Sequence, residues 1–160
     1  MSFNLLKRKY KMNEIYSVVD GVSFPIEKVD DNMFSKKLMG EGIAIAPISS
    51  IVSAPCTGVL TTLFPTGHGF GITREDGVEI LVHIGLDTVN LKGLGFKKLK
   101  TKDQMVTVGE PIVEVNLDLL NQEKMNSTIL VVFLDLKGKT LMLDKYGEVL
   151  RKKSVIANVD

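Results

Sequence analysis

The sequence has few or none of several residue types, and each shortage excludes a class of protein. Its 160 residues include one cysteine and no tryptophan, and aromatic residues make up 6%. The single Cys56 cannot form an internal disulfide, which fits a reducing compartment, so we expect a cytoplasmic protein. No apolar run is long enough to span a bilayer, and no apolar core of a signal peptide follows the basic start. A formal net charge of +1 gives no indication of nucleic-acid binding.

A basic N-terminal segment, which we take as residues 1–14, precedes a single domain that we assign to residues 15–160. The start of this segment mixes apolar and basic side chains: Phe3, Leu5, Leu6, Lys7, Arg8, Lys9, Tyr10 and Lys11. A short basic amphipathic segment can lie on an anionic membrane surface, so peripheral contact with the inner face of the membrane is one interpretation. We favour a flexible, solvated terminus, because chain ends usually are of that kind.

Most of the remaining chain has the pattern of β-strands. Short apolar runs are separated by turns rich in Gly, Pro and Asp, at residues 15–24, 42–47, 58–64, 69–73, 78–86, 111–115, 128–134 and 140–143. Many short strands at this spacing predict an antiparallel sandwich or barrel. Weak helix signals occur over 30–39 and over 116–123, where Asn116 or Asp118 would be the N-cap. We therefore predict an all-β fold, a hybrid of antiparallel β-sandwich and barrel with one or two short helices.

The two histidines of the chain, His68 and His83, flank a strong hairpin signal. Asp-Gly at residues 76–77 lies between two apolar runs, which is typical of a two-residue β-hairpin turn. With that turn, His83 faces Phe70 across the pair of strands and His68 faces Gly85. Alternation then puts all four residues on one face of the hairpin. The two imidazoles become diagonal neighbours, close enough for their rings to meet.

A histidine pair of this kind has two interpretations. Single histidines on apolar strands are mostly hydrogen-bonded core residues. Histidine also changes charge near neutral pH and acts as a nucleophile, a base or a metal ligand. Glycine weakens a strand unless a ligand or another backbone must come close, and four glycines surround this pair: Gly67, Gly69, Gly71 and Gly85. We therefore predict a functional site, whose chemistry the residues alone leave open.

Five segments of the chain form a larger motif. They read GEGIAIAP at 40–47, APCTG at 54–58, PTGHGFGI at 65–72, EILVHIGLDTV at 79–89 and LKGLGF at 91–96. Together they make the chain, from about Ile15 to its end, resemble the glucose-type enzyme IIA domain of the bacterial phosphoenolpyruvate-dependent sugar phosphotransferase system. The run around His83 is the most specific of the five. The resemblance implies a phosphotransferase component with a phosphohistidine intermediate.

The resemblance also implies a role for each residue of the site. His83 would take a phosphoryl group on Nε2 from phospho-HPr and pass it to a cysteine on the sugar-specific IIB domain of a membrane permease. The carbonyl of Gly85 would hold Nδ1 of His83. His68, oriented by Thr66, would donate a hydrogen bond to the phosphoryl oxygens without carrying the group. A second imidazole suits a transfer that depends on positioning and charge stabilisation.

A docking surface is implied as well, because both exchange partners are proteins. We expect an apolar patch with a polar rim. Asp31 and Asp87 match acidic positions that face basic residues of HPr, whereas Asn90 stands where the family has a further acid, which would weaken steering of the donor. The apolar candidates are Met33, Phe34, Leu38, Met39, Phe64, Phe70, Leu81 and Val89.

Two other interpretations stay open. Two imidazoles make a partial zinc site, and the nearest further candidates are Cys56 and Asp87, of which Cys56 is better explained as a small core residue. We therefore expect no intrinsic metal and no cofactor for the transfer, although His68 and His83 would bind zinc if a partner supplied a carboxylate. In the regulatory alternative, phosphorylation of His83 selects between partners. We expect a monomer, and the sequence does not determine the sugar.

Overall fold

The structure is a computed structural model that describes residues 10–160, so the expectations for residues 1–9 lie outside the described residues. Its strands are β1 (Glu14–Tyr16), β2 (Gly21–Pro25), β3 (Gly42–Pro47), β4 (Ile51–Ser53), β5 (Gly58–Leu63), β6 (Gly69–Thr73), β7 (Glu79–Ile84), β8 (Phe96–Lys98), β9 (Met105–Val106), β10 (Pro111–Val115), β11 (Ile129–Asp135), β12 (Leu141–Leu143), β13 (Gly147–Val149) and β14 (Val155–Val159). The helices are α1 (Asn32–Ser35) and α2 (Leu117–Gln122), with 3-10 turns η2 (Ile26–Lys28) and η3 (Thr88–Leu91). None of the helices in this described part is long and apolar enough to cross a membrane.

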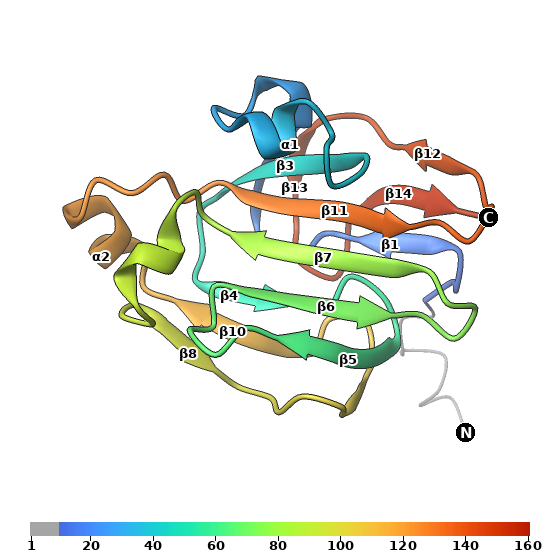
Figure 1. The fold of residues 1–160 in the computed structure, drawn as a ribbon. Helices are drawn as coiled ribbons and strands as arrows, with labels where there is room; N and C mark the ends of the chain where they lie inside the picture. The colour runs from blue at the N-terminus through green and yellow to red at the C-terminus, as the bar shows by residue number, and fades with distance from the viewer. Residues whose placement is uncertain (1–9) are drawn as a thin grey trace, which may run out of the picture.

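Residues 10–160 form one eight-stranded sheet and two three-stranded sheets (Figure 1). The large sheet has the order β13-β2-β3-β11-β7-β6-β5-β9, and the small sheets have the orders β1-β14-β12 and β4-β10-β8. The paired strands run antiparallel throughout. The predicted all-β class, with two short α-helices, is therefore confirmed.

Both predicted helices begin at a side-chain cap. Asp31 precedes α1, and its carboxylate accepts a hydrogen bond from the backbone N–H of Met33 at 2.9 Å. Asn116 precedes α2, and its side-chain oxygen accepts from the backbone N–H of Leu119 at 3.0 Å. Of the two caps considered for the second helix, the structure thus uses Asn116. Such bonds satisfy backbone donors that a helix start leaves without partners.

The register of the β6–β7 hairpin differs from the prediction by one residue. His83 is opposite Gly69, and Phe70 is opposite Val82. The turn holds three residues, not two: the N–H of Arg74 donates to the carbonyl of Val78 at 2.8 Å, and Gly77 has a φ of +91°. A three-residue hairpin with glycine in this conformation is the next common type after the two-residue turn. The prediction that Phe70 shares a face with His83 is therefore wrong.

The central strands are buried on both faces. One set of their side chains enters the main core, which includes Phe70, Val82 and Val131. The alternate set, which includes Leu81 and Leu130, forms a second cluster on the opposite face: Ile26, Val29, Phe34, Ala44, Leu81, Leu86, Leu130 and Val132. The segment around α1 covers this second face at one edge of the large sheet (Figure 1). Because His83 is two residues from Leu81 on β7, it lies on the second face, at the end of the smaller cluster.

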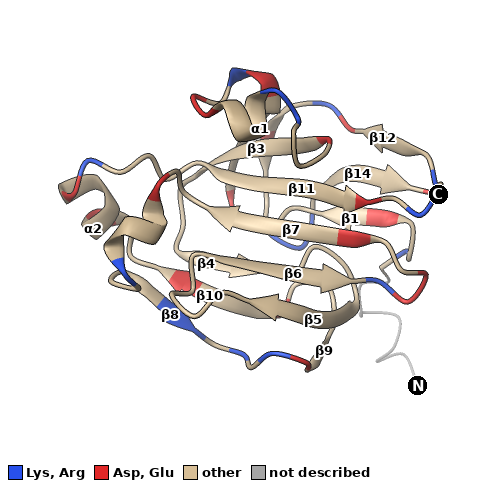
Figure 2. Cartoon of the chain, in the orientation of Figure 1, with Lys and Arg blue, Asp and Glu red and all other residues tan. Residues whose placement is uncertain are grey.

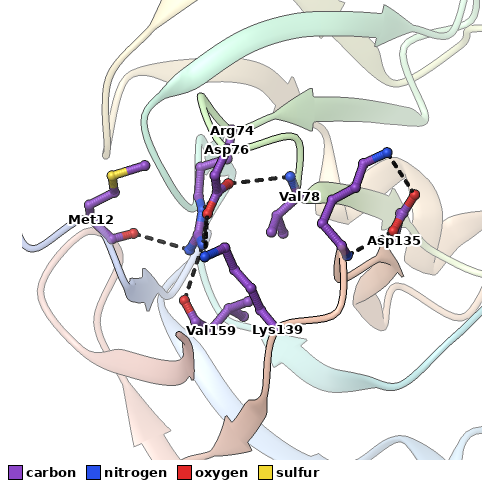
Figure 3. A network of polar contacts seen from close by, with 8 residues as sticks. Met12, Arg74, Asp76, Val78, Asp135, Lys139 and Val159 are labelled. Atoms are coloured by element: carbon purple, nitrogen blue, oxygen red, sulfur yellow. Dashed lines mark hydrogen bonds and ion pairs between the residues drawn. The ribbon is translucent and has the colours of Figure 1, made fainter.

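A buried arginine fastens the tip of the β6–β7 hairpin to both ends of the described chain (Figure 3). The Arg74 side chain is 3% exposed, and it forms an ion pair with Asp76 at 2.5 Å. Its guanidinium also donates to the backbone carbonyls of Met12 and Val159, each at 3.1 Å. A buried charge is stable only when it is paired and hydrogen-bonded, which this network provides. The guanidinium beside Asp76 lowers the pKa of that carboxyl to about 2.

Candidate functional site

The His83 ring is held in one tautomer by the backbone just after β7. Its Nδ1 is 2.8 Å from the carbonyl oxygen of Gly85. A carbonyl oxygen only accepts, so Nδ1 carries the proton and Nε2 has the free lone pair. Gly85 has a φ of +79°, and a Cβ there would lie 2.4 Å from Cγ2 of Thr88. Position 85 therefore requires glycine, and its backbone conformation turns the carbonyl toward the imidazole.

His68 reaches His83 from a tight turn rather than from a strand. The turn connects β5 and β6, with the N–H of Gly67 donating to the carbonyl of Phe64 at 2.8 Å. The hydroxyl of Thr66 is hydrogen-bonded to Nδ1 of His68. The His68 and His83 ring centroids lie 5.2 Å apart, with the ring planes at 83°. The rings meet as the sequence suggested, but strand alternation is not the reason, because His68 precedes β6.

Both imidazoles are neutral near pH 7. Burial, together with a smaller effect of the nearby His83, lowers the pKa of His68 to about 4. Burial also lowers the pKa of His83, although the hydrogen bond to Gly85 and the charges of Asp31 and Asp87 oppose that effect. A neutral imidazole with its proton fixed on Nδ1 presents Nε2 as a nucleophile.

Aromatic rings surround the pair. The Phe34 ring centroid is 5.1 Å from that of His83, and the Phe64 ring is 4.8 Å from that of His68. Phe96, at the start of β8, lies 6.4 Å from the His68 ring. A Cβ at Gly69 would lie 2.6 Å from Cε2 of Phe64, so this glycine leaves room for the phenyl ring. Phe96 was not among the predicted site residues, since nothing local indicates that β8 returns to the His68 turn.

The predicted docking residues differ in their accessibility. Met33, Leu38 and Val89 are 49%, 67% and 51% exposed. Met39 and Phe64 are half-buried, while Phe34 and Leu81 are 6% and 5% exposed and belong to the second cluster. Phe70 is fully buried in the main core, so it cannot contribute to a surface patch. The shift in hairpin register explains this error.

The predicted acidic residues lie on the two segments that flank His83. Asp31 caps α1, and Asp87 precedes η3 with a φ of +60°. The charged residues of the adjacent strands, Glu79 of β7 and Asp135 of β11, lie at the other end of these strands (Figure 2). The sheet beside His83 is therefore apolar, with carboxylates only at its margin.

A metal site within the chain would need further ligands. Residues 10–160 contain no group of three or more His, Cys, Asp or Glu side chains placed to hold a metal ion. Cys56 is buried in the main core, where burial raises the pKa of its thiol to about 12. Zinc at His68 and His83 would therefore need ligands from a partner, because structural zinc usually has four.

Comparison with known proteins gives a consistent family. The model of a family described as phosphoenolpyruvate-dependent sugar phosphotransferase system, EIIA 1, matches residues 13–138. The chain is 41% identical over 136 residues to the glucose-specific EIIA component of Mycoplasma capricolum, which covers 85% of this chain and 88% of that protein. It is 36% identical over 143 residues to the glucose-specific EIIA component of Haemophilus influenzae, covering 89% of this chain and 86% of that protein.

A solved structure and longer relatives agree with this. Glucose permease IIA from Mycoplasma capricolum superposes with a TM-score of 0.86 at 39% identity, over 93% of this chain and 98% of that chain. The glucose-specific EIICBA component of Staphylococcus carnosus is 37% identical over 142 residues, and the match spans only 21% of its length. The chain therefore belongs to the EIIA type 1 family of the phosphoenolpyruvate-dependent sugar phosphotransferase system, as the five sequence segments indicated.

Proposed function

We propose that this protein is a phosphoryl carrier that accepts a phosphoryl group from phospho-HPr on Nε2 of His83. It then passes the group to a cysteine of a IIB domain during coupled sugar uptake. One observation carries the proposal. The Nδ1 proton of His83 is held by the Gly85 carbonyl at 2.8 Å, and a second imidazole lies 5.2 Å away. This arrangement supports a prepared nucleophile with a neighbouring hydrogen-bond donor.

Each transfer is a displacement at phosphorus. In the first, the Nε2 lone pair of His83 bonds to phosphorus and the bond between phosphorus and the donor breaks. In the second, a cysteine thiolate bonds to phosphorus, and the electron pair of the nitrogen–phosphorus bond returns to Nε2. With the Thr66 hydroxyl donating to its Nδ1, His68 keeps a proton on Nε2, and this N–H donates a hydrogen bond to the phosphoryl oxygens. Charge stabilisation and positioning of this kind are the main contributions to phosphoryl transfer.

The surface around the site suits protein partners. Met33 of α1, Leu38 just after it and Val89 of η3 have exposed apolar side chains on the segments that flank His83. We propose that HPr and the IIB domain dock there in turn, with Asp31 and Asp87 attracting basic residues of HPr. The fused EIICBA relatives support a partner with IIB segments, and the relatives named glucose-specific support glucose as the sugar. The working place would be the cytoplasmic face of the membrane.

A zinc-bridged complex with a partner protein is a second candidate function, and the proximity of the two imidazoles favours it. His68 and His83 would supply nitrogen ligands, and a partner would supply a carboxylate. Such a complex would need unphosphorylated His83, so phosphorylation would switch it off. In the regulatory alternative, this phosphorylation-sensitive zinc complex would be the way in which the protein selects its partner. The phosphoryl transfer itself would need no resident cofactor.

The test is phosphoryl transfer in vitro. The protein is incubated with phosphoenolpyruvate, enzyme I and HPr, and the acid-labile phosphate is mapped by mass spectrometry. We expect a single phosphate on His83 and none on a His83→Gln variant. A His68→Gln variant should still accept phosphate but should pass it to a glucose IIB domain at least about a hundredfold more slowly, as when a group that stabilises the transition state is lost.

Three outcomes would contradict the proposal or part of it. Acid-labile labelling retained in the His83→Gln variant would show that the acceptor lies elsewhere. A wild-type transfer rate in the His68→Gln variant would remove the role of that residue. Zinc bound in a complex of the unphosphorylated protein with a partner, together with no phosphate on His83, would favour the regulatory alternative instead.

A further inference from the structure

We infer that Phe34 and Phe64 are shielding residues that slow the hydrolysis of the phosphohistidine on His83. The inference rests on the proposed function, because it concerns the same imidazole after it has accepted the phosphoryl group. It gives the two phenyl rings a task that is separate from contact with partner proteins. They would keep water away from the bond between Nε2 and phosphorus.

The need for a shield follows from the hydrogen bond at Nδ1. The carbonyl of Gly85, 2.8 Å away, only accepts, so the proton stays on Nδ1 when a phosphoryl group occupies Nε2. The phosphorylated ring then carries a positive charge, and it leaves as a neutral imidazole without taking up another proton. Such a ring is a good leaving group for a cysteine thiolate and for water alike. Tautomer control makes the phosphoryl group transferable, and it does not by itself distinguish between the two acceptors.

The two rings come from separate parts of the chain and converge on the imidazoles. Phe34 belongs to α1, is 6% exposed, and its ring centroid lies 5.1 Å from that of His83. Phe64 directly follows β5, and its ring lies 6.4 Å from His83 and 4.8 Å from His68. Phe64 also packs against the cluster that contains Phe34. Apolar surface at these distances leaves little room for ordered water beside the ring.

Few polar groups are placed to activate a water molecule here. Within residues 10–160, the hydrogen bonds of the two imidazole rings go to the carbonyl of Gly85 and the hydroxyl of Thr66, and both use Nδ1 atoms. Asp31 and Asp87 act on His83 through their charge, without a hydrogen bond to its ring. In hydrolysis, a water oxygen bonds to phosphorus, the nitrogen–phosphorus electron pair returns to Nε2, and a proton passes to solvent. Without a bound base, that proton transfer depends on how much water the phenyl rings admit.

The experiment measures the lifetime of the phosphorylated full-length protein. The protein is phosphorylated by incubation with phosphoenolpyruvate, enzyme I and HPr, and it is then separated from the donor. A variant that docks poorly with HPr is phosphorylated with phosphoramidate instead. Loss of phosphate is followed by intact mass. We expect Phe34→Leu and Phe64→Leu each to shorten the lifetime at least about threefold, because each opens a path for water. The double variant should shorten it further.

A matched control separates shielding from loss of stability. Phe133→Leu makes the same change at a phenyl ring that is 3% exposed in the main core, and it should leave the lifetime unchanged. A second readout is the rate of phosphate loss as free imidazole is added as a small nucleophile. The slope of this rate against imidazole concentration should be steeper in the Phe34 and Phe64 variants than in the wild type. In Phe133→Leu it should equal the wild-type slope.

The outcomes keep this inference apart from the proposed function. If the wild type is phosphorylated and the phosphohistidine lives as long in both site variants as in the wild type, the shielding role is wrong. The proposed function is then unaffected. Equal shortening in Phe133→Leu also overturns the shielding role, since the effect would then be general destabilisation. Absence of phosphate from wild-type His83 with either donor contradicts the proposed function, and the shielding role with it.

Discussion

Gly85 shows how a residue without a side chain directs the chemistry of its neighbour. Its φ of +79° and the 2.4 Å separation that a Cβ would have from Thr88 leave no room for another residue. The same conformation brings its carbonyl to Nδ1 of His83. Backbone geometry therefore leaves the free lone pair of His83 on Nε2, while the burial of both rings lowers their pKa values.

The lowered pKa of His68 predicts a loss of stability in mild acid. Its folded-state pKa of about 4 lies below the ordinary value of 6.5, so between these values the unfolded chain binds a proton that the folded chain does not. Stability is therefore complete above pH 6.5 and falls as the pH drops toward 4. We expect the wild type to lose about 2 kcal/mol at this residue between pH 7.5 and pH 5.

Urea unfolding at the two pH values measures this loss. A His68→Gln variant lacks the titrating group, so its stability should fall less over the same interval. The remaining decrease would include the contribution of His83, whose pKa is lowered in the same direction. An equal decrease in the wild type and the His68→Gln variant would show that His68 does not titrate differently on folding.

At the scale of elements, the short helix α1 links stability to the site. Asp31 caps α1 through the N–H of Met33, and its charge raises the pKa of His83. Asp31→Ala removes both effects, whereas Asp31→Asn keeps a capping oxygen and removes only the charge. We expect the pKa of His83 to fall in both variants. Stability should fall by about 1 kcal/mol in the alanine variant alone.

Histidine titration by NMR and urea unfolding test the two effects separately. The asparagine variant is the control for the cap, because asparagine is as good an N-cap as aspartate. A pKa of His83 that stays at the wild-type value in both variants would show that Asp31 does not act on the imidazole. Equal loss of stability in both variants would assign the effect to charge rather than to capping.

The stability of the β6–β7 hairpin depends on a second local interaction, the ion pair between Arg74 and Asp76. We expect Asp76→Ala to cost about 3–5 kcal/mol, because it leaves a buried guanidinium without its counter-ion. Asp135→Ala is the control, since its ion pair with Lys137 is 43% and 50% exposed and should contribute less than about 1 kcal/mol. Figure 3 shows both pairs. Urea unfolding compares them, and similar losses would argue against a special role for the buried pair.

At the scale of the whole molecule, the folded unit is larger than the family match. The family model ends at residue 138, but β12, β13 and β14 follow it. The central strand of one small sheet is β14, and Ile156, Ala157 and Val159 are at most 2% exposed in the main core. Large apolar side chains in such positions contribute a few kcal/mol each.

A chain that ends at residue 138 should therefore fail to fold cooperatively. It would lack β14, which pairs with β1, and β13, which pairs with one edge of β2, and it would leave a large part of the main core open to water. Near-ultraviolet circular dichroism and urea unfolding would test this against the full-length chain. A single cooperative transition in the truncated chain would show that the last strands are accessory.

Local sequence patterns determined much of the secondary structure of this protein and identified its family. Alternating apolar residues and turn residues predict the strands, Asn116 marks the start of the second helix, and the segment around His83 identifies the family. These features depend on neighbours in the chain, so they can be read before the fold is known. The pairing of two histidines was also predictable, because a short hairpin connects them.

Only the tertiary structure decided the hairpin register, the face on which Phe70 lies and the approach of Phe96 to His68. The register depends on a three-residue turn whose Asp76 is held by Arg74, and Arg74 in turn bonds to Met12 and Val159 at the far ends of the described chain. The second face of β7 becomes a site because the distant α1 segment covers it with Phe34. Contacts of this kind join residues far apart in sequence, and no local pattern records which partners will meet.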